Sequence, residues 1–230
     1  MKTQSSPLSV LRSLSVALLL AGALSSTASA ALIAAWDLNN APNMMDDPTP
    51  PPWDYDANVT VSDITLHGSV TPSSSASPMI YAGFGTSISL TDYIGFTVTP
   101  NAGYQLTLTD LFTIRPGTGA TTYSWGYRIG SGEWNIFTGV LTPTGASNQL
   151  APFTFATPIV TDQTVEIGYF ASTASPSTQV FISVAASNRN DIQLNGTVAA
   201  VPEPSTYGLI LGGGLLALIL ARRRKTTASI

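Results

Sequence analysis

The sequence predicts an all-β body, an antiparallel sandwich of two sheets with jelly roll as the favoured topology. It also predicts an N-terminal signal peptide and one C-terminal transmembrane helix. Apolar and polar residues alternate with a period of two across most of residues 31–200, which is the strand period. Runs rich in Thr, Val, Ile and aromatic residues are separated by Gly, Pro and Ser turn signals. No segment of the body has a convincing amphipathic helical pattern, so packed sheets are the expected architecture.

About ten short strands are expected from this alternation. The predicted strands cover residues 32–36, 59–66, 93–98, 104–109 with its continuation 111–115, 122–129, 133–140, 153–155, 164–170, 180–185 and 192–198. Residues 100–103 (PNAG) predict a turn, and residues 130–132 (GSG) predict a tight hairpin. Residues 37–57, with the proline run at 48–52, and the Ser-rich residues 71–77 are predicted loops.

The first thirty residues are typical of a secretory signal peptide. Lys2 and Arg12 give a positive start, an apolar stretch follows from Leu14 to Leu24, and Ala28-x-Ala30 fits a cleavage site. We therefore expect export by the Sec route and a mature chain that begins after Ala30.

Charge in the exported body is strongly negative. The chain has 9 Lys and Arg, but six of them lie in the two terminal segments, which leaves Arg115, Arg128 and Arg189 for residues 31–201. Twelve of the 13 acidic residues lie in the same span, so its formal charge is 3 − 12 = −9. A lysine-free acidic surface excludes nucleic acid and anionic lipid as partners of the body. The chain has no cysteine, so disulfides and thiolate metal sites are excluded too.

Three features follow one another at the C-terminus. Pro202-Glu203-Pro204 is a rigid, non-helical segment, because proline fixes its own φ and restricts the residue before it. The uncharged residues 206–221 predict a transmembrane helix, whose apolar part at 207–221 spans only about 22 Å. Arg222, Arg223, Arg224 and Lys225 follow at once, and such a basic cluster stays in the cytoplasm.

This order of rigid motif, short span and basic tail at residues 201–230 resembles the PEP-CTERM sorting signal of Gram-negative bacteria. The resemblance implies recognition of Pro202, Glu203 and Pro204 by an exosortase-type processing enzyme. It further implies transient anchoring in the inner membrane with the body in the periplasm, then passage to the cell surface or its extracellular polysaccharide. The alternative is an ordinary C-terminal anchor with a stiff linker. Residues 35–39, 103–108, 127–132 and 191–198 resemble the sandwich domains attached to such tails.

Catalytic signals are sparse in the body. His67 is its one histidine and has no Gly-x-Ser-x-Gly elbow to accompany it. One histidine without cysteine also excludes an ordinary zinc site. Glu133 and Glu166 are the body's two glutamates, and their spacing does not indicate the paired carboxylates of glycoside hydrolysis, which stays an open alternative. We expect no enzyme and no cofactor.

A structural calcium ion is the remaining question of cofactor chemistry. Asp37 and Asp191, which flank the first and last strands, are the candidate ligands. Further acids lie in the long loop at positions 46, 47, 54 and 56, but no Asp-x-Asp-x-Asp-Gly loop is present. Solvated carboxylates are therefore the favoured interpretation.

Aromatic residues fall into two groups. Tyr123, Trp125 and Tyr127 alternate along one strand, which predicts an inward-facing core stripe more strongly than a platform for sugar rings. Trp53, in the polar loop, and Trp134, beside the hairpin, are the preferred carbohydrate-contact candidates.

The sequence thus predicts a structural or adhesive exported protein. A carbohydrate-binding module is the alternative, and a secreted glycan hydrolase the third possibility.

Overall fold

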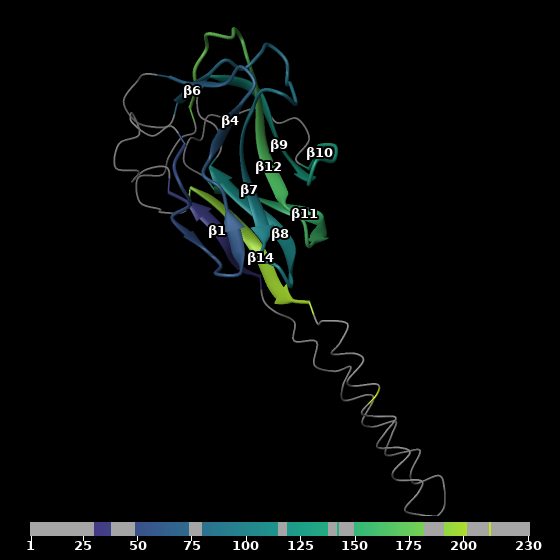
Figure 1. The fold of residues 1–230 in the computed structure, drawn as a ribbon. Helices are drawn as coiled ribbons and strands as arrows, with labels where there is room; N and C mark the ends of the chain where they lie inside the picture. Colours follow the sequence, from purple (N-terminus) through teal and green to yellow (C-terminus); the bar gives the residue numbers. More distant parts are fainter. Residues whose placement is uncertain are drawn as a thin grey trace, which may run out of the picture.

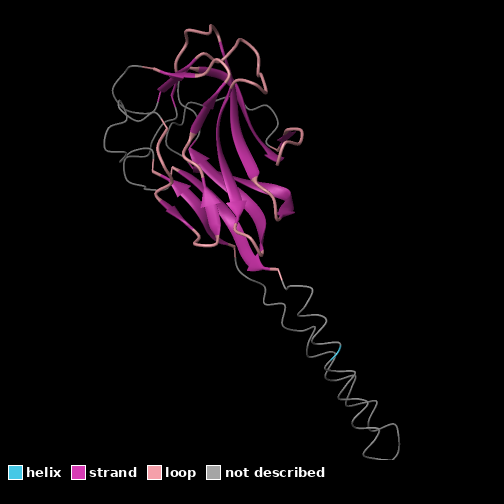
Figure 2. Ribbon diagram, viewed as in Figure 1, coloured by secondary structure: helices cyan, strands magenta, loops and turns pink. Residues whose placement is uncertain are grey.

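A computed structural model describes residues 30–37, 49–73, 80–114, 119–137, 142, 150–181, 191–201 and 212. Nearly all regular structure in these residues is β-strand, and the long strands form two sheets packed face to face (Figures 1 and 2). The prediction of an all-β two-sheet sandwich is therefore confirmed. The predicted signal peptide and C-terminal helix lie almost wholly outside the described residues. Among the residues that are described, no helix is long and apolar enough to span a membrane.

The first sheet, which we call the β14 sheet, contains five antiparallel strands. In spatial order they are β11 (Leu150–Thr161), β8 (Tyr104–Ile114), β14 (Ile192–Ala200), β1 (Ala31–Trp36) and β2 (Asp54–Tyr55).

The second sheet, the β12 sheet, lies against it. Its order is β10 (Asn135–Ile136), β9 (Ala120–Ile129), β12 (Val165–Thr173), β7 (Tyr93–Pro100) and β3 (Val59–Val61), and β4 (Thr65–His67) also pairs with β7. A small third sheet consists of β13 (Val180–Phe181), β6 (Ile80–Ala82) and β5 (Thr71–Pro72).

Aromatic side chains fill the space between the two large sheets. Trp36 of β1 packs on Phe96 of β7 with ring centroids 4.0 Å apart. At the other side of the sandwich, Tyr127 of β9 meets Phe155 of β11 at 6.0 Å. Strand β1 therefore covers β7, while β11 covers β9. This places β2 and β10, each one strand further out, at opposite edges of the sandwich.

The predicted aromatic stripe on β9 belongs to this core. Tyr123 and Trp125 are each 3% exposed, and Tyr127 is half-buried against the same cluster. The core interpretation is confirmed, because bulky rings on alternate positions of a strand fill the gap between two sheets.

Several predicted boundaries are wrong, and backbone pairing explains them. The predicted loop 37–57 contains β2, because the Trp53 amide donates to the Ala35 carbonyl at 2.8 Å. The predicted strand 59–66 is two strands, β3 and β4, separated by residues 62–64, where the Ile64 amide donates to the Pro50 carbonyl at 3.1 Å. Strand β8 includes both the predicted strand 104–109 and its continuation, whereas β11 is much longer than predicted.

The remaining boundary errors involve short strands. Residues 133–140 form only β10 within their described part, and β5 and β6 were not expected at all. The two predicted turns are confirmed: Gly103 and Gly130 both adopt positive φ, at 84° and 55°, a conformation that glycine adopts without strain.

Candidate functional site

A cluster of polar and aromatic side chains lies on the outer face of the β12 sheet. Because neighbours along a strand face opposite sides, the buried core residues Ile167 and Tyr169 of β12 leave Glu166 and Gly168 on the outer face. We call the side chains gathered there the outer-face cluster. Its members are Glu166, Tyr93, Arg128, His67 and Trp134.

Three glycines form the floor of this cluster. Gly95, Gly168 and Gly126 lie directly opposite one another on β7, β12 and β9. A Cβ on Gly168 would lie 2.8 Å from Cη2 of Trp134, and one on Gly95 would lie 3.0 Å from Cε2 of Tyr93. The absence of side chains therefore lets these two rings lie close to the sheet.

Glu166 is the polar centre of the cluster and is only 8% exposed. The Tyr93 hydroxyl donates to its Oε1 at 2.7 Å. Arg128 donates to its Oε2 through Nε at 2.7 Å and pairs with the same oxygen through Nη2 at 2.6 Å. The Arg128 Nη2 also donates to the Tyr93 hydroxyl at 3.2 Å. Both carboxylate oxygens are thus used inside the fold, as a buried charge requires.

Aromatic contacts surround this ion pair. His67 stacks on Tyr93 with centroids 4.1 Å apart and planes 7° from parallel. Trp134 meets the rings of Tyr93 and Phe170 edge-on, each at 4.9 Å. The Arg128 guanidinium lies 4.8 Å from the Trp134 ring centroid, within the range of a cation–π contact.

Two pKa values are displaced in the cluster. Burial, followed by the hydrogen bond and the charge of Glu166, raises the pKa of Tyr93, so its phenol keeps the proton that it donates. Burial lowers the pKa of His67 and outweighs the opposing attraction of Glu166, whose Oε1 lies 3.7 Å from its Nε2. The His67 Nε2 also lies 2.8 Å from the Thr65 hydroxyl. His67 is therefore a half-buried, hydrogen-bonded residue of β4.

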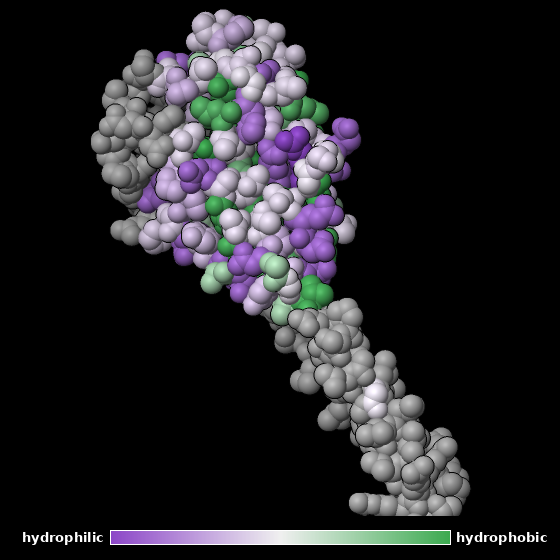
Figure 3. All heavy atoms as spheres, in the orientation of Figure 1, coloured by the Kyte–Doolittle hydropathy of each residue, from purple (hydrophilic) through white to green (hydrophobic). Residues whose placement is uncertain are grey.

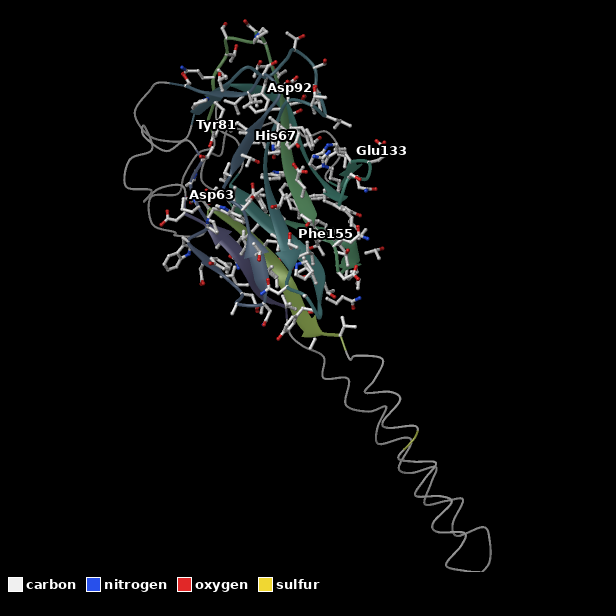
Figure 4. All side chains as sticks on the ribbon, viewed as in Figure 1. Asp63, His67, Tyr81, Asp92, Glu133 and Phe155 are labelled. Atoms are coloured by element: carbon white, nitrogen blue, oxygen red, sulfur yellow. The ribbon has the colours of Figure 1, made fainter. Side chains whose placement is uncertain are left out.

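The two glutamates of the hydrolase hypothesis have different surroundings. Glu166 is held by Arg128 and Tyr93, whereas Glu133 is exposed at the hairpin before β10. Figure 4 shows Glu133 at the β10 edge of the molecule, apart from His67 on β4.

The two predicted carbohydrate contacts also differ. Trp134 is half-buried in the outer-face cluster, whereas Trp53 is 49% exposed. They lie beside β10 and β2, the opposite edges of the sandwich, so the structure does not bring them together.

A second aromatic ring accompanies Trp53. Tyr55 is 51% exposed and lies two residues after Trp53 at the same edge. The exposed Asp54 stands between them in the sequence. We call Trp53, Asp54 and Tyr55 the β2 strip. Sequence reasoning missed Tyr55, although an aromatic–acid–aromatic triplet within a supposed loop was the available signal. Elsewhere Figure 3 shows hydrophobic residues scattered among hydrophilic ones on the face in view.

The two candidate calcium ligands lie at one end of a strand pair. Trp36 pairs with Ile192, and the Asp191 amide donates to the Trp36 carbonyl at 2.9 Å, so Asp37 and Asp191 flank the same end of β1 and β14. The Asp191 side chain is fully buried. Within the described part of the chain, no group of three or more His, Cys, Asp or Glu could hold a metal. The expectation of a solvated carboxylate is wrong for Asp191, which the fold buries, and a calcium ion stays the alternative.

The last strand leads directly into the predicted sorting segment. Strand β14 ends at Ala200, and the Val201 amide still donates to the Gly103 carbonyl at 2.8 Å. Residues 200–225 match the family model of the PEP-CTERM protein-sorting motif. This chain carries a PEP-CTERM sorting motif. The motif implies export and sorting to the cell surface. The individual roles of its residues stay predictions, because these residues lie outside the described part of the chain. They are Pro202, Glu203, Pro204 and the basic cluster Arg222, Arg223, Arg224 and Lys225.

Comparisons of the whole chain with known proteins add little to the evidence from the sorting motif. No curated protein matches it. Among solved structures, the family 32 CBM from C. perfringens NanJ in complex with galactose is similar at 14% identity and a TM-score of 0.28, over 62% of this chain and 95% of that one. A likeness at this level carries no argument about function.

Removing the charge of Glu166 should destabilise the fold. In Glu166→Gln, the amide leaves the guanidinium of Arg128 without its buried counter-charge, and we expect the free energy of unfolding to fall by about 1–3 kcal/mol. The matched variant Glu133→Gln changes an exposed carboxylate and should alter it by less than about 0.5 kcal/mol. Urea denaturation of both variants measures the difference. Equal effects would show that the ion pair does not stabilise the fold.

Protonation of His67 should make stability depend on pH. The fold lowers the pKa of His67 below its ordinary 6.5, so the unfolded chain takes up this proton first as the pH falls. The stabilisation is complete above about pH 6.5 and is lost below it. Between about pH 7.5 and pH 5, the wild-type chain should lose more stability than His67→Gln, which keeps Glu166, Arg128 and Tyr93. Parallel stability curves for the two proteins would contradict the assignment.

Proposed function

We propose that this chain is a non-catalytic surface protein, exported by Sec, that acts as a structural or adhesive unit at the cell surface or in the extracellular polymer. A C-terminal helix would hold it in the inner membrane, with the body in the periplasm, until an exosortase-type enzyme processes the tail. The observation that carries the proposal is the sorting motif at residues 200–225, which begins at the last residue of β14.

The chemistry of the body supports a non-catalytic role. Glu166, the acid of the outer-face cluster, accepts hydrogen bonds from Arg128 and Tyr93. His67 is hydrogen-bonded to Thr65. A general base needs to reach the proton of a reacting group, and these side chains are instead engaged with one another. They are best explained as parts of the fold.

A jelly roll is the topology that the strand order supports. With β1, β7, β8, β9, β10, β11, β12 and β14 numbered 1 to 8, the sheets read 6-3-8-1 and 5-4-7-2. This is the order that two Greek keys give in an eight-stranded jelly roll. Strand β2 extends the first sheet beyond β1, and β3 and β4 extend the second beyond β7. Such a closed body with short edges suits a surface unit, because long open edges promote aggregation.

Carbohydrate binding is the second candidate function, and one observation favours it. The β2 strip presents two half-exposed aromatic rings beside a carboxylate. Tyr and Trp combine a large apolar face with a polar group, which fits the C–H faces and hydroxyl groups of sugars. The third possibility, glycan hydrolysis, has no comparable support, because Glu166 is committed to its ion pair.

Processing at the tail is directly testable. Mass spectrometry of the surface form should find a C-terminus near residues 201–205, because the processing enzyme is expected to cut near Pro202-Glu203-Pro204. Glu203→Ala should leave residues 222–230 on the protein and move it to the membrane fraction. The control Glu133→Ala, which changes an exposed acid of the body, should be processed normally. Recovery of intact residues 222–230 from wild-type surface protein would instead support an ordinary membrane anchor.

A further inference from the structure

We propose that the β2 strip is a binding platform for an uncharged polysaccharide, with the exposed rings of Trp53 and Tyr55 as stacking surfaces. The proposal rests on the carbohydrate-binding candidate above and deepens it, since it names the residues and the class of ligand. It concerns the β2 edge of the first sheet, whereas the outer-face cluster lies on the outer face of the second sheet.

Exposure sets these two rings apart from the other aromatic residues. Trp53 and Tyr55 are 49% and 51% exposed, whereas every other aromatic side chain whose burial is described is buried or half-buried. Trp53 lies in the bend just before β2, and Tyr55 is the second residue of that strand. Isolated exposed aromatics are ordinary, but two exposed rings two residues apart at one edge offer a ligand more than one stacking surface.

The backbone holds the strip in a fixed position. The Trp53 amide donates to Ala35 at 2.8 Å, and the Asp56 amide donates to Ile33 at 3.0 Å, so β1 holds both ends of the strip. The Asn58 amide then donates to the Asp56 carboxylate at 2.7 Å and closes the turn into β3. A platform fixed before binding loses little conformational entropy when a ligand docks.

Charge selects the class of polysaccharide. Asp54 is exposed within the strip, and the sequence contains no Lys or Arg from residue 31 to residue 114. The exported body as a whole carries a formal charge of 3 − 12 = −9. Uronic-acid or sulfated polymers would be repelled by this surface. Neutral sugars would not be repelled.

Pairing with a second copy of the chain is a poorer use of this edge. Strand β2 is only two residues long, and residues 50–52 just before it are all proline. Proline has no amide hydrogen to donate to another strand, and short edges resist pairing. The side chains of the strip, and not its backbone, are therefore what it offers to a partner.

The test uses the full-length chain in detergent and two panels of oligosaccharides. One panel contains neutral hexose oligomers built from glucose, galactose or mannose, and the other contains uronic-acid oligomers. We expect wild-type protein to bind at least one neutral oligomer in a calorimetric titration and none of the uronic-acid panel. Trp53→Ala/Tyr55→Ala should weaken this binding about tenfold or more, while Trp53→Phe/Tyr55→Phe should keep most of it.

Val160→Ala is the matched control, because Val160 is 54% exposed on β11 at the far edge of the first sheet. It should bind like wild type, and circular dichroism should show that all variants are folded. Unchanged binding in the double alanine variant would overturn the platform, as would binding of the uronic-acid panel alone or of neither panel. None of these results affects surface sorting, which fails only if the protein is absent from the surface fraction.

Discussion

Packing of aromatic rings between the two sheets is the interaction on which this structure depends. The chain has no cysteine, so disulfides contribute nothing, and burial of apolar surface is the main source of stability. Trp36 is fully buried against Phe96 at 4.0 Å and joins β1 to the opposite sheet. Strand β1 in turn supports β2 on one side and β14 on the other. The β2 strip and the strand that leads to the sorting motif are both positioned by this core.

The outer-face cluster stabilises a buried acid. Arg128 is the one arginine or lysine among the described residues, and it is used to neutralise Glu166. The Tyr93 hydroxyl and the Trp134 ring complete the shell around the pair. The described part of the body therefore has little positive charge left to present to a partner. This distribution favours a neutral polymer over an acidic one as the ligand that we propose.

Much of this fold could be predicted from the sequence, because a period of two in hydrophobicity records which side of a strand faces the core. Tyr123 and Trp125 were assigned to the core on this basis, and both are buried. The outer-face cluster could not be predicted. Its glycine floor depends on Gly95, Gly168 and Gly126 being opposite one another on three strands, and one sequence does not reveal cross-strand register. Strand β2 was missed for the same reason, since only its pairing with β1 makes Asp54 and Tyr55 a strand.

In the function that we propose, the tail places the protein at the surface and the β2 strip contacts the ligand. Indole N–H signals of the four tryptophans, Trp36, Trp53, Trp125 and Trp134, test this assignment most directly in a titration with a neutral oligosaccharide followed by NMR. The account predicts that the Trp53 signal, identified through its loss in Trp53→Phe, shifts with ligand while those of the core and of Trp134 do not. A shift of the Trp134 signal with Trp53 unchanged would contradict it.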